Sequence, residues 1–410
     1  MKTVAVIGAL DTKSDEFYFL KEAIEQQGVS TIIVDTGILG EPKFRPDISA
    51  AQVAAAAEAD LDMMRQEQSR QKSNDVMLKG AAIVVKNLYE KGSIDGAITM
   101  GGGRGTIVGG EVMRSLPIGF PKVIISTQAT NAYAQHMFEG INDTFVVNSL
   151  VDISGVNEIL KMILKKAAVT IAGLVNMGTI VIEKKRPRIA LSMLGITTPC
   201  VSVMQEHLER AGYETLVFHS NGLGGVSMEK LIRQGWIDGV ADVTPAEITA
   251  YALGGIGSAG PDRLESAALS GVPQIVVPGA MDIIDFSPPE SVPEKYQNRR
   301  FIMHVSSLKV IRTSIEENIK MGKTMAEKLN QSVAPVMVVF PLKGLSANDY
   351  EGAEFYDKEA DMMLLETLEA NLREDIPVIC LPYHINDRIF AEKTAELVIE
   401  MMQGVYQNET

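Results

Sequence analysis

Four titratable side chains in the second half of the chain stand at or shortly after the ends of predicted strands. They are His219, Asp242, Asp282 and His384. Histidine exchanges a proton near neutral pH, and a nearby carboxylate can accept or orient that proton, as general acid–base catalysis requires. We therefore predict that these four residues form a catalytic site that acts on a small polar substrate.

Two other kinds of chemistry stay open for the same loops. His219, His304 and His384 could together bind a metal ion, although their positions lack the short ligand spacing of a local metal motif. Ser220 or Ser346 could serve as the nucleophile of a Ser-His-Asp triad, although no Gly-x-Ser-x-Gly turn is present. Ordinary hydrogen bonding in loops is the structural alternative for these histidines. We assign no metal ligands.

A glycine-rich segment of the first half is the strongest candidate for a phosphate site. It follows a predicted strand and consists of Gly101, Gly102, Gly103, Arg104, Gly105 and Thr106. Glycines let backbone N–H groups come close to a phosphate, and the guanidinium of Arg104 adds a forked donor. The segment is not a Walker A loop, because no Gly-Lys-Ser or Gly-Lys-Thr follows. A glycine-rich turn without a ligand is the alternative.

Two further turns of the first half could face the same phosphate. Asp11, Thr12 and Lys13 follow the first predicted strand and lead into a helix, whose free N–H groups favour an anion. Ser126 and Thr127 follow a later strand and offer hydroxyl groups. The alternative for these polar residues is that they cap helices. We predict that both turns contribute to a nucleotide site.

The elements that position these loops are buried parallel strands. Apolar runs rich in Val and Ile, which are typical of strands buried on both faces, alternate with amphipathic stretches of helical length such as 14–27 and 203–211. This alternation predicts βαβ units of the α/β class. We expect strands at 3–8, 31–35, 96–100, 123–126, 188–194, 215–219, 239–243, 274–278, 336–341 and 378–382.

Three passages of the first half recur in the same order in the second half. The segment 4–8 matches 189–193, 92–96 matches 235–239, and 119–125 matches 271–277. The repeat predicts two tandem Rossmann-like domains, each doubly wound around a mainly parallel sheet, at 1–184 and 185–410. Because ligands of open α/β sheets bind beyond the carboxyl ends of the strands, we expect a ligand cleft between the two domains.

The first half holds 42 more residues than the second between the first two repeated passages. These residues fit an alanine-rich insertion at about 49–91, where Val53, Leu61 and Met64 follow helical spacing. We expect one or two long helices. They form an arm or an oligomer contact, or they pack on their own domain.

Composition limits the classes of partner. The chain has 410 residues and a formal net charge of −14, which disfavours nucleic acid. No apolar run approaches the roughly 18 residues of a membrane span, and no signal peptide precedes the first predicted strand. Cys200 and Cys380 are expected to be buried free thiols. We therefore expect a cytoplasmic protein without nucleic-acid or membrane partners.

Several motifs taken together resemble the Tm-one-like ATP-binding domain family, an uncharacterised protein family. They extend over most of the chain and comprise 8–13, 101–106, 116–122, 195–200, 258–265, 277–282 and 384–387. The resemblance implies an intracellular two-domain α/β protein that binds ATP in its N-terminal half, with or without magnesium. It also implies a homodimer or a higher homo-oligomer.

The resemblance leaves more than one function open, because most members of that family have no assigned reaction. The main hypothesis is an ATP-binding enzyme that acts on a small polar metabolite. A plant member binds the replication protein of a tobamovirus, so a non-catalytic, nucleotide-responsive module that binds a protein is the first alternative. A hydrolase or lyase of a sugar or carboxylate that needs no nucleotide is the second.

Overall fold

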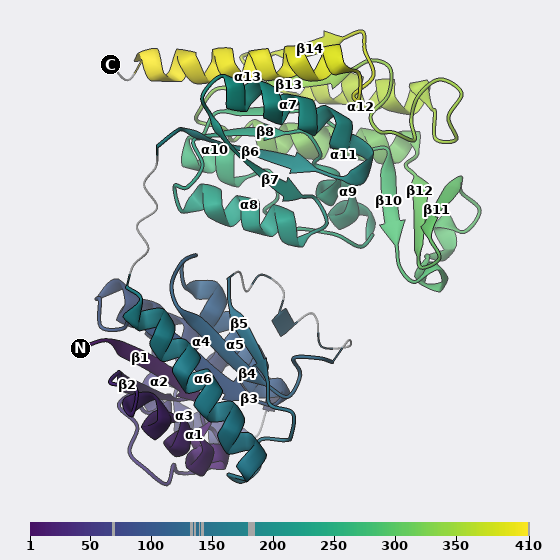
Figure 1. The fold of residues 1–410 in the computed structure, drawn as a ribbon. Helices are drawn as coiled ribbons and strands as arrows, with labels where there is room; N and C mark the ends of the chain where they lie inside the picture. Colours follow the sequence, from purple (N-terminus) through teal and green to yellow (C-terminus); the bar gives the residue numbers. More distant parts are fainter. Residues whose placement is uncertain are drawn as a thin grey trace. The chain divides into compact units, whose positions relative to one another are not determined.

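The computed structural model divides the chain into two compact units, Met1–Ile182 and Glu183–Thr410 (Figure 1). It describes residues 1–67, 70–131, 134, 137–138, 140, 143–178 and 185–408. Each unit has its own parallel sheet, so we describe the two separately.

The sheet of the N-terminal unit is parallel throughout and has the strand order β2-β1-β3-β4-β5. Its strands are β1 (Thr3–Gly8), β2 (Ser30–Asp35), β3 (Gly96–Gly101), β4 (Lys122–Ser126) and β5 (Phe145–Asn148). The first four confirm the predicted strands. The edge strand β5 was not predicted; its residues Phe145 and Val146 are exposed, unlike those of the central strands.

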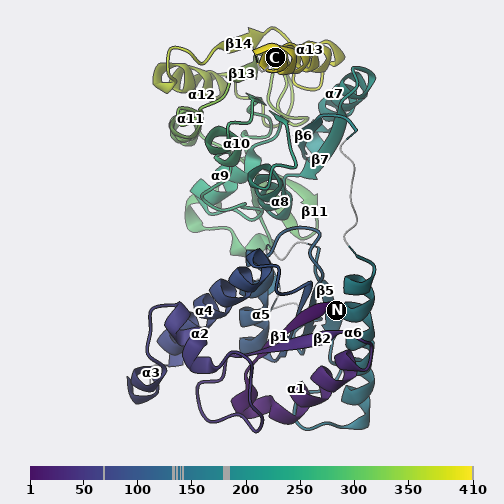
Figure 2. The same ribbon diagram turned by 90° about the vertical axis from the view of Figure 1, so that its left-hand side faces the viewer.

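Helices cover both faces of this sheet, because successive side chains of a strand point to opposite sides. Val4 and Val6 of β1 pack with α1 (Leu10–Glu25) and α6 (Glu158–Asn176). Ala5 and Ile7 pack in a second cluster with α5 (Gly103–Ser115) and the alanine-rich insertion. Figure 2 shows these two layers on opposite sides of β1 and β2, and the doubly wound α/β fold is thus confirmed for this unit.

The insertion forms three helices instead of one or two long ones. They are α2 (Ala50–Ala56), α3 (Leu61–Glu67) and α4 (Arg70–Glu90). Val53, Met77 and Val85 are buried in the same cluster as Ile7 of the sheet. At Gly80 an added Cβ would lie 2.0 Å from the carbonyl oxygen of Val53, so α2 and α4 are in close contact. The insertion therefore packs on its own unit and is not an arm.

The C-terminal unit repeats this topology with one more strand. Its parallel sheet has the order β14-β13-β9-β8-β6-β7, in which the first strand in the chain again lies between the second and the third. The strands are β6 (Arg188–Met193), β7 (Glu214–His219), β8 (Gly239–Asp242), β9 (Gln274–Val276), β13 (Val336–Pro341) and β14 (Val378–Leu381). All six predicted strands are present, and the recurring passages 4–8 and 189–193 form equivalent strands.

Among the residues that the structure describes, this unit has seven α-helices. They are α7 (Thr198–Arg210), α8 (Leu223–Arg233), α9 (Ala246–Leu253), α10 (Ser266–Ser270), α11 (Ile315–Leu329), α12 (Lys358–Asn371) and α13 (Arg388–Asn408). Apolar side chains of α7 and α13 pack in one cluster with β6, and those of α11 and α12 pack in another with β13. This sheet is therefore also buried between helices.

A small antiparallel sheet between β9 and α11 was not predicted. It has the order β10-β12-β11 and consists of β10 (Ile283–Phe286), β11 (Phe301–Val305) and β12 (Leu308–Arg312), which lie beside the main sheet in Figure 1. The register between β11 and β12 shifts between Met303 and Val305, so His304 lies in a β-bulge. Bulges change the direction of a side chain and are frequent next to active sites.

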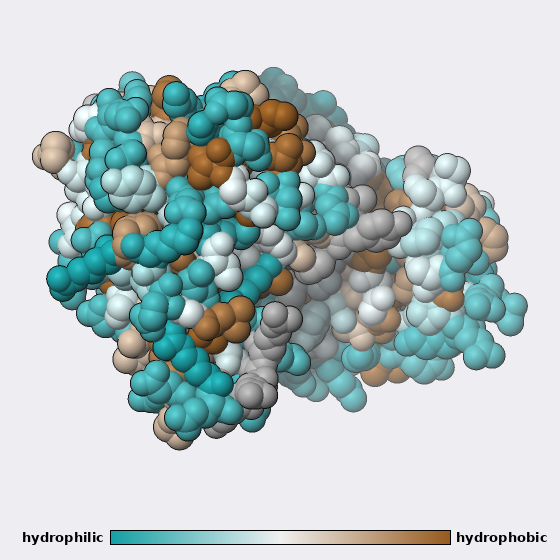
Figure 3. Space-filling model, turned by 90° about the horizontal axis from the view of Figure 1, so that it is seen from below, coloured by the Kyte–Doolittle hydropathy of each residue, from teal (hydrophilic) through white to brown (hydrophobic). Residues whose placement is uncertain are grey.

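Surface features agree only in part with the sequence-based expectations. Figure 3 shows hydrophobic residues in small groups among hydrophilic ones on one face of the molecule. Among the residues that the structure describes, no helix has both the length and the apolar character needed to cross a bilayer. Cys200 is buried and free as expected, whereas the free thiol of Cys380 is exposed because β14 lies at the edge of its sheet.

Candidate functional site

The two predicted phosphate loops of the N-terminal unit lie next to each other, because β1 pairs with β3. The strand order of this sheet reverses at this point, which is where open α/β sheets bind ligands. The topology therefore brings the turn at 9–13 and the glycine-rich segment at 101–106 to one crevice.

The turn after β1 uses its polar groups within the unit. Asp35 at the end of β2 accepts hydrogen bonds from the N–H of Leu10 at 3.0 Å and from that of Gly37 at 2.8 Å, so a carboxylate already occupies the start of α1. Asp11 accepts hydrogen bonds from two N–H groups of the loop at 38–39. The ammonium group of Lys13 donates to the carbonyl of Ile153. Thr12 is exposed, and these contacts favour a structural role for Asp11 and Lys13.

The glycine-rich segment has one part that the fold requires and one part that it does not. A Cβ added at Gly101 would lie 2.6 Å from Cα of Gly105, and a Cβ added at Gly105 would lie 3.1 Å from the carbonyl oxygen of Met100. These two glycines therefore allow α5 to approach β3. At Gly103 an added Cβ would meet no atom within 4 Å. Packing therefore does not explain glycine at position 103.

The polar residues around this segment divide in the same way. The hydroxyls of Thr106 and Ser126 are buried and lie 2.6 Å apart, so they bond to each other. Arg104 donates to the carbonyl of Thr36 at 3.0 Å. Thr127 Oγ1 would lie 3.7 Å from a Cβ added at Gly102. Gly102 at the N-cap of α5 makes no side-chain cap bond, and helix N-termini are common places for anions to bind.

The C-terminal unit contains a pocket of about 430 Å³ beyond the carboxyl ends of β6 and β7. Its walls are mainly apolar and come from the loop after β6, helix α9 and the antiparallel sheet. Six polar residues line it: His219, Ser220, Asn221, Asp285, His304 and Asn348. An apolar pocket with a few convergent polar groups is the usual form of a small-molecule site.

Asp285 and His304 give this pocket a pair of titratable groups that interact. Burial raises the pKa of the Asp285 carboxyl to about 6, and the charge of His304 opposes that rise. The bulge in β11 places His304 at the pocket, and His219 lines the same pocket at the end of β7. A carboxyl that titrates near neutral pH can serve as a general base or acid.

Two buried oxygen atoms of the pocket residues have no hydrogen-bond partner within the described part of the chain. They are Ser220 Oγ and Asp285 Oδ1. Ser220 is 5% exposed, so water has little access to its hydroxyl. An unsatisfied buried polar group costs about 1–3 kcal/mol, and each such group in a native fold needs a reason.

Asp242 does not line this pocket and lies in a buried ion-pair cluster instead. Both of its oxygens accept hydrogen bonds from Arg263, which also donates to Glu247 at 2.6 Å. Glu247 in turn accepts from the N–H groups of Gly222 and Gly225 at the start of α8. Asp242 and Arg263 are both 1% exposed. These contacts favour a structural role for Asp242 over the predicted catalytic one.

Asp282 and His384 are also engaged elsewhere. The Ser346 hydroxyl donates a hydrogen bond of 2.7 Å to Asp282. Burial raises the pKa of Asp282 to about 7. The charge of Asp349 adds to this rise, and the charge of Arg312 opposes it. His384 bonds to the carbonyl of Ser346 through Nε2 at 2.9 Å and accepts the N–H of Asn386 through Nδ1. Neither residue lines the pocket.

Only His219 of the four predicted acid–base residues therefore lies at the pocket. Sequence reasoning missed Asp285, and it named His304 as a titratable candidate without including it among the four acid–base residues. The available signal was a charged residue inside each of two short apolar segments, 283–286 and 301–305. Across the described residues, no group of three His, Cys, Asp or Glu side chains is arranged to hold a metal ion, so the three-histidine alternative does not form there.

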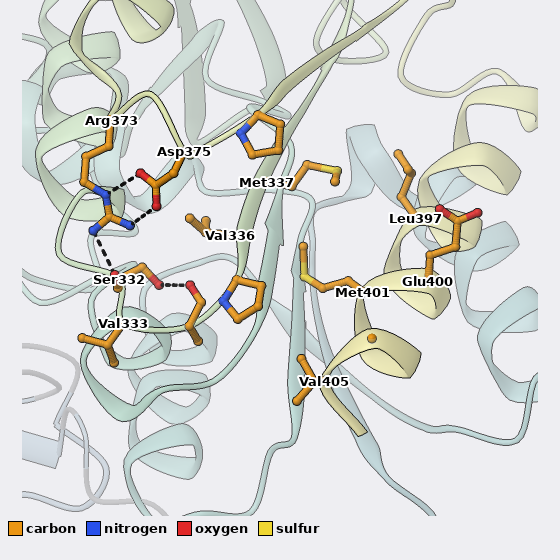
Figure 4. A pocket seen from close by; sticks show the side chains of 14 residues that line it. Ser332, Val333, Val336, Met337, Arg373, Asp375, Leu397, Glu400, Met401 and Val405 are labelled. Carbon is orange, nitrogen blue, oxygen red and sulfur yellow. Dashed lines mark hydrogen bonds and ion pairs between the residues drawn. The ribbon is translucent and has the colours of Figure 1, made fainter. Parts of the chain in front are cut away.

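A second cavity, of about 570 Å³, lies where β13 and β14 begin (Figure 4). Its Arg373 donates two hydrogen bonds of 3.0 Å to Asp375 and a further one to the carbonyl of Ser332, as Figure 4 shows. The remaining wall is largely apolar and includes Leu397 and Met401 of α13. Because this cavity lies at the amino ends of the strands and its arginine is paired, we favour the pocket with Asp285 as the functional site.

Some solved structures resemble this chain only weakly. These structures are 11–12% identical to this chain. One is the UDP-GlcNAc 2-epimerase of Methanocaldococcus jannaschii, with 12% identity and a TM-score of 0.22, and the match covers 67% of this chain and 83% of that one. A likeness at this TM-score carries no functional argument.

Sequence relatives are much more similar. A UPF0261 protein of Clostridium tetani is 40% identical over 403 residues, which cover 98% of this chain and 99% of that protein. The ToMV resistance protein Tm-1(GCR237) of Solanum lycopersicum is 33% identical over 423 residues, which cover 97% of this chain but 55% of that protein. Residues 2–179 and 186–402 match the N-terminal and C-terminal domain models of one family. The chain belongs to the uncharacterised protein family UPF0261.

Proposed function

We propose that this chain is an enzyme that performs acid–base chemistry on a small metabolite in the pocket of the C-terminal unit. The observation that carries the proposal is that His219, Asp285 and His304 line one pocket, in which burial raises the pKa of Asp285 to about 6. Titratable groups with shifted pKa values gather at catalytic sites more often than elsewhere. The apolar walls supply the water-poor surroundings in which proton transfer is effective.

In the proposed reaction Asp285 is the general base. At neutral pH a carboxyl with a pKa of about 6 is mostly ionised, yet it is a stronger base than an ordinary carboxylate. His304 lies near enough to influence the pKa of Asp285, so it can hold the charge of the pair or return the proton. His219 is exposed at the pocket and can donate to an oxygen of the substrate.

We further propose that the N-terminal unit binds ATP, with or without magnesium, with its phosphates at the start of α5. The open space at Gly103, the lack of a side-chain cap among the described residues and the nearby guanidinium of Arg104 support this site. Gly102 and Thr127 border it, whereas Asp11 and Lys13 serve the fold. The resemblance to an ATP-binding family supports the choice of nucleotide, and a cytoplasmic homodimer is part of the same proposal.

Hydrogen–deuterium exchange into a panel of metabolites tests the acid–base function on many candidate substrates. The purified chain is incubated in D₂O with sugars, hydroxy acids and their lactones, with and without ATP, and loss of C–H signals is followed by NMR. Exchange should fall at least tenfold in Asp285→Asn and in His304→Gln, because general-base catalysis contributes about 10²–10⁴-fold. Asp375→Asn, in the cavity of Figure 4, is the control and should leave exchange unchanged.

Exchange that persists in both pocket variants would contradict the assignment of Asp285 and His304. If His219→Ala, Asp285→Asn and His304→Gln were all tolerated while ATP still bound, a nucleotide-responsive module without catalysis would be the better interpretation. Light scattering of the purified chain tests the homodimer directly.

A further inference from the structure

The pocket of the C-terminal unit contains enough chemistry to restrict the class of its substrate, and this step rests on the proposed function. Among the described residues that line the pocket, none is a lysine or an arginine. Asp285 is the only carboxylate among them, and its pKa of about 6 leaves it mostly negative at pH 7. His304 already interacts with Asp285. A phosphate or carboxylate placed here would lose its hydration without gaining a free cation, which is costly.

The walls of the pocket indicate a largely apolar body. Ile283 of β10, Ile302 of β11, and Leu308 and Val310 of β12 all line it, together with Ala246 and Ala250 of α9. Removal of apolar surface from water is favourable, so these walls favour a ligand with an apolar face. A polyol that is hydrated on every side would gain little from them.

The two oxygen atoms without partners in the described part of the chain indicate which polar groups the body carries. Asp285 Oδ1 of the ionised carboxylate can only accept a hydrogen bond, so its natural partner is a ligand hydroxyl. Ser220 Oγ is buried and can donate to a carbonyl oxygen. One hydroxyl and one carbonyl on the same small molecule would satisfy both atoms.

We infer that this pocket binds an uncharged hydroxycarbonyl compound with an apolar face, such as a hydroxy ester or hydroxy lactone, and that it discriminates against carboxylates and phosphates. The ligand hydroxyl donates to Asp285 and its carbonyl accepts from Ser220. This arrangement places the general base beside a hydroxyl, and next to the carbon that bears it.

Matched pairs of neutral and anionic probes test the inference on the full chain. Pantolactone is compared with pantoate, and methyl mandelate with mandelate, by saturation-transfer NMR at pH 7.5. We expect the lactone and the ester to bind at least about tenfold more tightly than their anions. Ile302→Trp, which fills the pocket, should abolish binding, and Ser220→Ala should weaken it about two- to tenfold by removing one hydrogen bond. Leu308→Lys adds a cation to the wall and should reverse the preference toward the anions.

The outcomes separate the substrate class from the proposed function. Tighter binding of the anions, lost in Ile302→Trp, would overturn the uncharged class but would leave acid–base chemistry in this pocket intact. Neutral probes that bind equally well to the wild-type chain and to Ser220→Ala would overturn the role of Ser220 and with it the inferred pairing. Failure of all four probes to bind, or binding that Ile302→Trp does not reduce, would overturn the inference, and the second result would count against the proposed function as well.

Discussion

Asp285 and His304 line one pocket from the two outer strands of the three-stranded antiparallel sheet, with β12 between them. Burial raises the pKa of the carboxyl to about 6, and the imidazole charge opposes part of this effect. The pair therefore combines a group that is costly to bury with a partner that compensates it incompletely. Such a residual cost is typical of sites kept for function, since residues optimal for activity are often unfavourable for stability.

The first prediction follows from that cost. The folded-state pKa of Asp285 lies above its ordinary value of 3.8. The contribution of this carboxyl to the free energy of unfolding is therefore fully present below about pH 4 and is lost as the pH rises through 6. The amide that replaces this carboxyl in Asp285→Asn does not titrate. Relative to wild type, Asp285→Asn should therefore gain about 1–3 kcal/mol of stability between pH 4 and pH 7 and no more above that.

Urea unfolding at several pH values measures this change. Trp236 is the only tryptophan and belongs to the C-terminal unit, so its fluorescence reports that unit. Parallel pH profiles for wild type and variant would show that Asp285 has an ordinary pKa in the folded protein.

The second prediction separates folding from binding at the start of α5. Gly103→Ala adds a methyl group in open space within a helix, so the fold should be unharmed or stabilised by about 0.5–1 kcal/mol. If ATP phosphates approach this position, the methyl group should weaken ATP binding at least about tenfold. Gly173→Ala in α6 is the matched control, because an added Cβ there also meets no atom within 4 Å.

Thermal-shift titration with ATP and isothermal titration calorimetry provide the measurement. Equal affinities of Gly103→Ala and Gly173→Ala for ATP would remove the start of α5 from the nucleotide site. A loss of affinity in both variants would indicate an effect on the fold rather than on contact with the phosphates.

The third prediction concerns a buried acid cluster outside the pocket. Asp361 accepts a hydrogen bond of 2.6 Å from Arg312. Burial raises the pKa of Asp361 to about 9. The charge of Arg312 opposes this rise, whereas Asp349 and Asp282 add to it. Because this folded pKa is raised, stability is lost as the pH rises from about 4 through 9. Asp361→Asn keeps an acceptor for Arg312 and removes the proton, so its stability should fall less steeply with pH.

Unfolding midpoints in urea between pH 5 and pH 9 test this slope. An identical slope in wild type and Asp361→Asn would mean that Asp361 is ionised throughout this range.

Most parallel strands could be predicted from sequence because the central ones bury both faces and read as nearly continuous apolar runs, as 336–341 does. The antiparallel sheet escaped prediction because its strands include charged positions, such as Asp285 and Lys309, and do not read as continuous apolar runs. Such strands are stable only beside their neighbours in a sheet, so their local pattern carries little information.

The site was predicted less completely for a related reason. His219 follows a parallel strand and lines the pocket, but position after a strand does not reveal what a side chain contacts. Asp242 stands at the end of β8, where a catalytic carboxylate is expected, yet its partner Arg263 is 21 residues further on. Only the folded chain shows that the two are paired.

The last prediction tests that pairing. Arg263 is 1% exposed and bonds to Asp242 and Glu247, with Glu229 a further 3.4 Å contact. Arg263→Met would leave three buried carboxylates without their shared cation. Because loss of one partner of a buried ion pair costs about 3–5 kcal/mol, the free energy of unfolding should fall by that amount.

The matched control is Arg388→Met, which removes an exposed ion pair with Glu392 of 2.8 Å. Surface pairs contribute about 0–1 kcal/mol, so the unfolding midpoint of this variant should hardly change. Urea unfolding followed by Trp236 fluorescence compares the two substitutions in one unit. If both lowered the midpoint equally, the cluster would not act as a buried ionic centre, and Asp242 would again be a candidate for catalysis.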